Sequence, residues 1–302
     1  MSRAIIIGSI NMDIVTYVQK HPKVGETIFC DDVKYFPGGK GSNQAISCKR
    51  LGCDTYMIGR VGNDEFGKQM IHFQKYEGIS TKHVKKLDGE LTGQAFITVS
   101  KDSQNSIIVM SGANLKWDDL FLEEITFKKE DVVISQFEVP NHVIEKAFML
   151  AKENEAITIL NPSPMRPISH QIKKNTDILI VNEIELEELT GKIDNIQDET
   201  TLFTHASLLI KSGYKTVIVT LGSAGVLLLS SKHKVIIKGH KVTPVDTTGA
   251  GDTFVGGIAS GIIRGLDMIE TVKFANIAAS LSVTKEGAAS SIPTIDEVNS
   301  II

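Results

Sequence analysis

Short apolar runs alternate with helix-period patterns along most of the chain, and this alternation limits the folds open to it. Six runs have the length and composition of strands buried on both faces, at residues 4–7, 56–58, 132–134, 157–160, 178–181 and 217–220. Helical patterns follow at residues 64–76, 141–152, 183–190, 201–211, 251–264 and 268–283. Strands separated by helices pair in parallel, with helices on both sheet faces. The sequence therefore predicts a layered α/β/α fold around a central, mostly parallel sheet.

Two segments interrupt this rhythm and indicate strands that meet without intervening helices. One covers residues 14–36, and the other consists of residues 93–100 and 106–110, joined by the polar turn 101–105. We interpret them as a small β-sheet that closes over a site, a lid, although a peripheral hairpin would give the same pattern. At 302 residues the chain is predicted to form one domain, residues 1–302, with its lid at about 14–36 and 93–111.

The composition argues against nucleic acid or a membrane as a partner. The formal net charge is -4, which provides no basic surface for either polyanion. No stretch approaches the roughly 18 consecutive apolar residues of a membrane span, and the first apolar run is too short for a signal peptide. The odd set Cys30, Cys48 and Cys53 indicates reduced thiols, so we expect a cytoplasmic protein. The eight scattered histidines show no ligand spacing.

A stretch near the carboxyl end, residues 245–254 (VDTTGAGDTF), carries the clearest chemistry. Its glycines let backbone N–H groups approach an anion, and the helix that follows directs its positive end toward the same place. Asp252 stands at the start of that helix, where it can accept a proton from an attacking hydroxyl. The stretch thus predicts a phosphoryl-transfer site.

Other polar groups follow predicted strands or glycine turns, each with an ordinary structural alternative. Residues 38–45 (GGKGSNQA) open a helix but could be a tight turn, and residues 8–13 (GSINMD) could end a strand in an Asx turn. Glu138 closes the stretch 136–138 (QFE) behind another strand. Asn182 and Glu185 are spaced for one face of a first helical turn, where they could reach Mg²⁺ or phosphate or merely stabilise their own helix.

Together these motifs resemble the signatures of the ribokinase-like family of carbohydrate kinases. Residues 38–45 match the early glycine-rich signature, and residues 246–252 match the highly specific late one. The similarity runs nearly end to end, from residues 8–13 to residues 287–293 (GAASSIP). The resemblance implies transfer of a phosphoryl group from ATP to the 5-hydroxyl of D-ribose, and a homodimer formed through the β lid.

Carried over position by position, the resemblance also implies roles for individual residues. It makes Asp252 the general base, beside an anion hole at Gly249, Ala250 and Gly251. Together with Asp252, it implies sugar contacts from Asn11, Asp13, Gly39, Lys40, Asn43 and Glu138. It implies ATP or Mg²⁺ contacts at Asn182, Glu185, Thr220, Gly222, Gly225 and Asn276. A monovalent cation, usually K⁺, is implied at Asp246, Thr248, Ser282, Lys285, Gly287 and Ser291, several of them acting through backbone carbonyls.

Three rival functions remain open. A related kinase could act on fructose, 2-deoxyribose or adenosine, although the polar sugar set favours a small polyol over a nucleoside. A noncatalytic sugar-binding regulator could share the fold, against which stands the intact Asp252 with its glycine turn. A nicotinamide dehydrogenase is disfavoured because no Gly-x-Gly-x-x-Gly follows the first strand.

Overall fold

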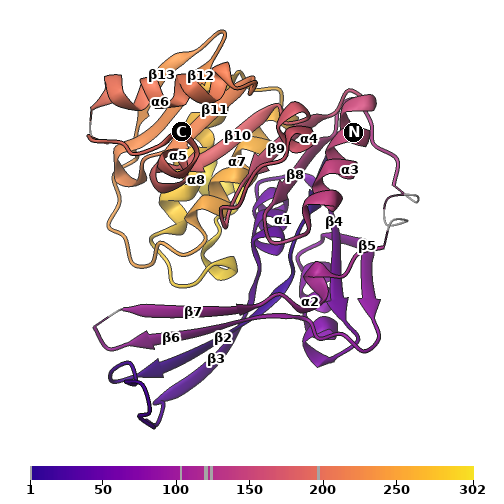
Figure 1. Cartoon of the computed structure of the whole chain (residues 1–302), viewed down its shortest axis with the longest axis vertical. Helices are drawn as coiled ribbons and strands as arrows, with labels where there is room; N and C mark the ends of the chain where they lie inside the picture. Colours follow the sequence, from indigo (N-terminus) through magenta and orange to yellow (C-terminus); the bar gives the residue numbers. More distant parts are fainter. Residues whose placement is uncertain (1, 103, 119–121, 123–124, 196–197) are drawn as a thin grey trace.

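In the computed structural model, a nine-stranded sheet runs through the body of the molecule in the order β13-β12-β11-β10-β9-β8-β1-β4-β5 (Figure 1). The structure describes residues 2–102, 104–118, 122, 125–195 and 198–302. All neighbours from β5 to β11 pair in parallel, whereas β12 and β13 add to the edge in antiparallel fashion. The strands are β1 (Arg3–Ile7), β4 (Asp54–Gly62), β5 (Ser80–Leu87), β8 (Val132–Gln136), β9 (Ile157–Asn161), β10 (Ile178–Asn182), β11 (Thr216–Thr220), β12 (Gly225–Ser230) and β13 (Lys234–Lys238). The predicted mostly parallel sheet is confirmed.

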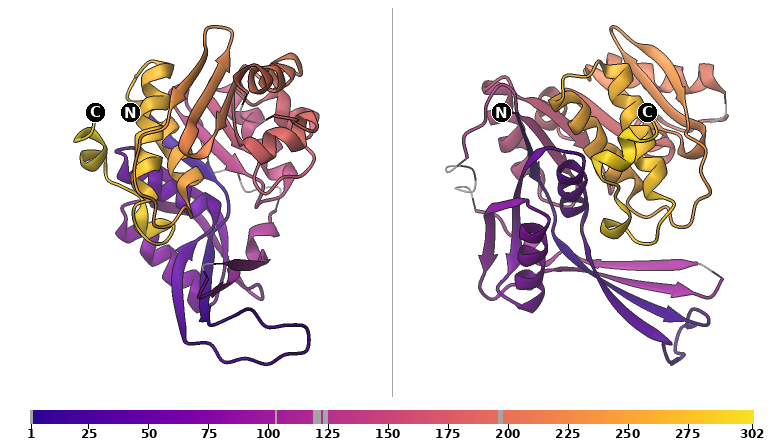
Figure 2. Two further views of the ribbon diagram at one scale, coloured as in Figure 1. Left: turned by 90° about the vertical axis from the view of Figure 1, so that its left-hand side faces the viewer. Right: turned by 180° about the vertical axis from the view of Figure 1, so that it is seen from behind.

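Helices cover both faces of this sheet, as the edge-on view in Figure 2 shows. One face carries α1 (Lys40–Arg50), α2 (Glu65–Tyr76), α7 (Ala250–Ile263) and α8 (Met268–Ser282), and α9 (Ile295–Asn299) packs on α8. The other face carries α3 (Asn141–Glu153), α4 (His170–Lys174), α5 (Glu183–Thr190) and α6 (Glu199–Lys211). Within the described ranges, no helix is long and apolar enough to cross a membrane.

The central strand β1 shows why the predicted apolar runs become two-faced strands. Ala4 and Ile6 belong to the core on the α7 side, while Ile5 and Ile7 belong to the core on the α3 side. Side chains alternate along a strand, so a continuous apolar run fills both cores at once. The six predicted strands and six predicted helices all form, with small shifts at their ends.

The edge strand β5 is the main element that the apolar runs of the sequence do not predict. Its sequence STKHVKKL leaves most side chains partly or fully exposed. Edge strands of this kind carry lysines that discourage further strand pairing, so they lack the apolar run of an interior strand. Periodicity alone therefore cannot identify them.

A second, four-stranded sheet projects from the body beside the carboxyl ends of β1 and β4 (Figures 1 and 2). It has the order β3-β2-β6-β7 and consists of β3 (Asp32–Gly38), β2 (Asn11–Val18), β6 (Gly93–Ser100) and β7 (Asn105–Met110). We call it the lid sheet. Its strands lie in the two segments predicted for a lid, except that β2 begins at Asn11 rather than residue 14. Residue 103 of the predicted turn lies outside the described residues.

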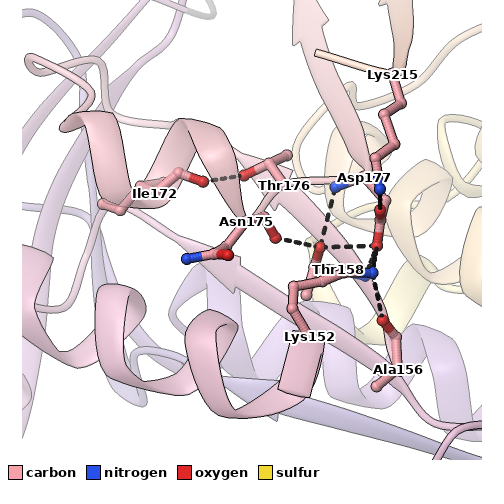
Figure 3. Close-up of polar contacts among 8 residues, drawn as sticks. All are labelled: Lys152, Ala156, Thr158, Ile172, Asn175, Thr176, Asp177 and Lys215. Atoms are coloured by element: carbon pink, nitrogen blue, oxygen red, sulfur yellow. Dashed lines mark hydrogen bonds and ion pairs between the residues drawn. The ribbon is translucent and has the colours of Figure 1, made fainter. Parts of the chain in front are cut away.

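At the opposite, amino edge of the main sheet, Asp177 ties three neighbouring strands together (Figure 3). Its Oδ2 accepts hydrogen bonds from Lys152 Nζ at 2.6 Å and from the Thr158 N–H at 3.0 Å, and its Oδ1 accepts one from Lys215 Nζ at 2.7 Å. Burial alone would raise the pKa of Asp177, but these donors more than offset burial and lower it. The ionised carboxylate therefore stabilises the body of the fold, away from the site.

We expect Asp177→Asn to reduce the free energy of unfolding by about 2–4 kcal/mol at pH 7, because two lysines lose a shared partner. A carboxylate with a lowered pKa contributes stability above about pH 4, its ordinary range, and that contribution is lost as the pH falls further. Urea unfolding at pH 7, about pH 4 and about pH 3 should therefore show a difference from wild type that is largely kept at pH 4 and shrinks at pH 3. Glu155→Gln, which breaks an exposed ion pair with Lys129, is the control and should change little. Equal stability of the Asp177 variant and wild type at pH 7 would contradict this role.

Candidate active site

The start of α7 has the geometry of an anion-binding turn. Gly249 is the N-cap residue with φ of +77°, in the left-handed region that favours glycine, and an added Cβ would lie 3.0 Å from the Ala288 Cα. The first backbone bond of the helix runs from the Thr253 N–H to the Gly249 carbonyl at 2.8 Å. The N–H groups of Gly251 and Asp252 therefore lie in the first turn, which has no helical acceptors, and the helix dipole adds positive potential there.

The carboxylate of Asp252 is buried and oriented by two amides from α1. Its Oδ2 accepts a hydrogen bond from Asn43 Nδ2 at 3.2 Å, and its Oδ1 accepts one from Gln44 Nε2 at 2.9 Å. Burial raises the pKa of Asp252, while nearby Lys40 and the two amides oppose the rise. A carboxylate with a raised pKa is a stronger base, which suits proton abstraction from an alcohol.

The glycine-rich turn before α1 positions Lys40 and Glu138. Gly39 caps the helix with φ of +87°, and an added Cβ would lie 2.8 Å from the Asn11 backbone nitrogen. Glu138 Oε2 accepts hydrogen bonds from the Lys40 N–H at 3.0 Å and from the Ser9 hydroxyl. Burial lowers the pKa of the Lys40 amine, but the charges of Asp252, Glu138 and Glu185 outweigh it, so the pKa is raised. Lys40 is therefore a half-buried cation among carboxylates.

Asn11 and Asp13 lie two residues apart on β2, so their side chains share one face of the lid sheet. Asn11 Oδ1 accepts a hydrogen bond from Asn114 Nδ2 at 2.7 Å, which leaves the Asn11 amide N–H groups as its free donors. Burial, with the negative charges of Glu138 and Asp252, raises the pKa of Asp13 to about 7. Asp13, Glu138 and Asp252 form an acidic cluster, which offers strong hydrogen-bond acceptors to a polyhydroxylated ligand.

A cavity of about 640 Å³ opens on the other side of the α7 turn. The ends of β11 and β12, the loop 239–247, α7 and α8 contribute to its walls. Four of the predicted nucleotide residues line it together with Ala250 and Gly251, and these are Thr220, Gly222, Gly225 and Asn276. An added Cβ on Gly251 would meet nothing within 4 Å, so the turn is open in front of this residue. The first turn of α7 thus borders both the cavity and, through Asp252, the acidic cluster.

The other two predicted nucleotide residues do not line this cavity but cap α5. Asn182 Oδ1 accepts a hydrogen bond from the Glu185 N–H at 2.8 Å, and Glu185 Oε2 accepts one from the Asn182 N–H at 2.9 Å. The structural alternative for this spacing, a residue pair that stabilises its own helix, is therefore realised. Each side chain still has a polar atom outside the capping pair, and the charge of Glu185 reaches Lys40.

The residues implied for a monovalent cation gather on the loops that flank α7 and α8. Asp246 Oδ1 accepts a hydrogen bond from the Thr248 N–H at 2.9 Å, and its Oδ2 accepts one from the Gly287 N–H at 2.9 Å. These donors outweigh burial and lower the pKa of Asp246. Lys285 Nζ pairs instead with Glu297 at 2.8 Å, so Lys285 can offer its carbonyl without its charge. Ser282 lies at the end of α8, and Ser291 in the short helix η3 (Ala289–Ser291).

Several residues that contact the predicted set were missed from the sequence. Gln44 holds Asp252, Ser9 donates to Glu138, and Asn114 fixes Asn11. Gln136 and Asn161, the last residues of adjacent strands β8 and β9, both contact Gln44. The available signal was their position, since amides that end neighbouring parallel strands meet at one sheet edge.

Comparison with known proteins identifies the class. The family model described as pfkB family carbohydrate kinase matches residues 1–295. Ribokinase from Haemophilus influenzae is 39% identical over 294 residues, covering 97% of this chain and 95% of that protein. Deoxyribokinase from Salmonella typhi is 34% identical over 297 residues, covering 97% and 96%. A solved structure of Arabidopsis thaliana ribokinase complexed with ribose and ATP matches with a TM-score of 0.91 and 33% identity, covering 100% of this chain and 99% of that one.

The chain therefore belongs to the pfkB family of carbohydrate kinases. The predicted resemblance, the ribokinase-like α/β fold with its small second sheet, and the assignment to an ATP-using kinase are confirmed. The roles of the individual site residues remain predictions. The contacts and distances described above say which of these residues lie together.

Two glycine substitutions in the α7 turn should distinguish a glycine that the backbone conformation requires from one that leaves room for a ligand. Gly249→Ala should lower stability by about 1–3 kcal/mol, because alanine is strained at a positive φ and meets Ala288. Gly251→Ala should keep the melting temperature within a few degrees of wild type yet weaken ADP binding, because its methyl group projects toward the cavity. Thermal unfolding and calorimetric titration with ADP measure the two effects. Loss of stability in both variants, with unchanged ADP binding, would contradict this reading of the turn.

Proposed function

We propose that this protein transfers the γ-phosphoryl group of ATP to the 5-hydroxyl of D-ribose, giving ribose 5-phosphate and ADP. The observation that carries the proposal is the buried Asp252 in a helix turn bordered by an open cavity. ATP would occupy the cavity, contacting Thr220, Gly222, Gly225 and Asn276. The sugar would lie against the acidic cluster and Asn11, Gly39, Lys40 and Asn43. The relatives named ribokinase, including one solved with ribose and ATP, support this choice of substrates.

The proposed reaction assigns each group a defined task. Asp252 takes the proton from the 5-hydroxyl as the hydroxyl oxygen attacks the γ-phosphorus, and the bond to the β,γ-bridging oxygen breaks to release ADP. In the proposal, the N–H groups at Gly249, Ala250 and Gly251 stabilise negative charge on the transferred group, and the Ala250 N–H exchanges its 3.3 Å hydrogen bond to the Thr247 carbonyl for a phosphoryl oxygen. Asn43 Oδ1 is a buried acceptor without a partner among the described residues, which suits a sugar hydroxyl as donor.

Two metal ions are part of the proposal. Mg²⁺ fits the oxygen-rich pair Asn182 and Glu185, and it would neutralise charge on the phosphates of ATP. K⁺ fits the loop ordered by Asp246, where Thr248, Ser282, Lys285, Gly287 and Ser291 can offer carbonyl or hydroxyl oxygens. The bonds from Thr248 and Gly287 to Asp246 support this, since they order the loop directly ahead of the anion turn.

We further propose that the lid sheet closes over the sugar and pairs two copies of the chain. Apolar side chains exposed on this sheet support a partner surface, namely Val33, Tyr35, Phe96, Ile107, Ile108 and Val109. Closure would exclude water and so limit unproductive ATP hydrolysis. The free cysteines Cys30, Cys48 and Cys53 are consistent with a cytoplasmic location.

An ADP-release assay with ribose, 2-deoxyribose, fructose and adenosine tests the substrate directly. Each acceptor should be assayed with Mg²⁺ in the presence and absence of K⁺. We expect the highest kcat/KM with ribose, and a higher rate with K⁺. A preference for 2-deoxyribose would instead match the relative named deoxyribokinase, and release with none of the four would favour a noncatalytic sugar-binding protein.

Asp252→Asn tests the catalytic base. The asparagine keeps the shape of the side chain but cannot accept the proton, so kcat should fall by about 10²–10⁴-fold. The melting temperature and ADP affinity should stay close to wild type, which serves as the control for folding. Near-normal turnover in the folded variant would remove Asp252 from this role.

The affinity for ribose should depend on pH through Asp13. With a pKa of about 7, this carboxyl is ionised above neutrality and accepts strong hydrogen bonds from sugar hydroxyls, whereas below neutrality it becomes protonated and a weaker acceptor. Calorimetric titration of ribose into the protein without nucleotide should therefore show tighter binding at pH 8 than at pH 6, by up to about tenfold. Asp13→Asn should bind weakly and without this pH dependence. Equal affinity of the wild type at both pH values would argue against Asp13 as a sugar ligand.

A further inference from the structure

Gln44 is a fully buried side chain whose amide nitrogen and oxygen are both hydrogen-bonded to other side chains. Its Nε2 donates to Asp252 Oδ1 at 2.9 Å and to Asn161 Oδ1 at 3.3 Å, and its Oε1 accepts a hydrogen bond from Gln136 Nε2. The reaction steps and substrate contacts proposed above do not use Gln44, whose contact with the site is its hydrogen bond to Asp252. A buried amide with every atom engaged is constrained in orientation, because turning it over would break several bonds at once.

The direction of this amide matters because its two ends carry opposite partial charges. With the observed bonds, the N–H end faces the Asp252 carboxylate. If the amide turned over, Gln44 Oε1 would face that carboxylate and repel it. Gln136 opposes this by donating to Oε1, and it is itself fully buried at the end of β8. Asn161 adds a second constraint, since its own Nδ2 donates to the Ile180 carbonyl at 3.2 Å and so directs its Oδ1 toward Gln44.

We propose that Gln44, held in one orientation by Gln136 and Asn161, is a positioning residue that aims the Asp252 carboxylate and keeps it ionised for proton transfer. This inference rests on the proposed role of Asp252 as the base. Gln44 acts through Asp252, so it has no contact with the reacting atoms itself.

Charged groups around Asp252 also affect the ionisation of its carboxyl. Lys40 on α1 favours the ionised carboxylate, while Asp13 on β2 is close enough for mutual repulsion with Asp252. Burial also disfavours the ionised form. A neutral amide donor stabilises the anion by hydrogen bonding and has no proton to lose in this pH range. Removing it should therefore make Asp252 harder to ionise.

Gln44→Met tests the proposal, because methionine has a similar volume and no hydrogen-bond donor. With ribose and ATP, we expect kcat to fall about 10- to 100-fold, since the base is misaligned. The acid limb of the kcat profile should move to higher pH by about one unit, the effect expected from losing one hydrogen bond to a charged group. The KM for ribose should change by less than about threefold. A purely structural role would lower activity without moving the acid limb.

Two further variants keep the test decisive. Gln136→Met removes the donor to Gln44 Oε1, and Gln136 itself is not hydrogen-bonded to Asp252. This variant should move the acid limb in the same direction by a smaller amount. Gln74→Met is the matched control, because Gln74 is equally buried and its Nε2 donates to Ser42 Oγ of the same helix α1 at 3.2 Å. Its pH profile should match that of wild type.

If Gln44→Met does not fold, the result with Gln136→Met decides. An acid limb that stays in place in every folded variant of Gln44 or Gln136 overturns the proposal. Asp252→Asn separates this outcome from failure of the proposed function. If that variant is inactive while the acid limb is unmoved in the glutamine variants, only the positioning role is wrong, whereas an active Asp252→Asn removes the base itself.

Discussion

A single buried carboxylate at the start of a helix imposes most of the demands that the surrounding structure meets. Asp252 is buried in the first turn of α7, the turn that also offers N–H groups to an anion. Burial disfavours its charge, so hydrogen-bond donors and a cation must compensate for the lost hydration. Asn43, Gln44 and Lys40 supply that compensation, and all three come from α1. The close packing of α1 against α7 is therefore as much a requirement of the site as of the core.

This requirement explains why glycine recurs where the two helices begin. Gly39 and Gly249 both adopt positive φ, and in each case an added Cβ would meet neighbouring backbone within about 3 Å. Farther along α7, Gly256 lies against Ser47 of α1, where an added Cβ would fall 2.1 Å from the Ser47 hydroxyl. Small residues thus let α1 and α7 approach closely enough for side chains of one helix to bond a carboxylate on the other.

The two edges of the main sheet have different roles: one stabilises the fold and the other carries the candidate site. At the amino edge, the ionised Asp177 joins the segments that lead into three strands, and its role is stability. At the carboxyl edge, β8 and β9 end in amides that contact α1, and β8 leads into Glu138, which accepts a hydrogen bond from the start of α1. Parallel strands make this division possible, because all of their carboxyl ends emerge on one side. Polar groups that are expensive to bury can therefore be gathered at one edge while the other holds the fold together.

Sequence patterns were sufficient for the fold and for the glycine turns and acid that form the candidate site. Continuous apolar runs such as residues 4–7 are specific for strands packed on both faces, and the glycine turns at 38–45 and 246–252 lie where the structure has helix starts. Edge strand β5 escaped because a half-exposed strand has no such run. The spacing of Asn182 and Glu185 does not distinguish helix capping from ligand binding, since both roles need the same spacing.

What the sequence determined by itself is local: where strands and helices form, which turns need glycine, and which acid stands at a helix start. Only the tertiary structure decided which distant side chains reach that acid. Gln44 is 208 residues from Asp252, and Gln136 lies 92 residues from Gln44. The orientation of a buried amide depends on partners supplied by other strands and helices, and periodicity along the chain carries no information about them.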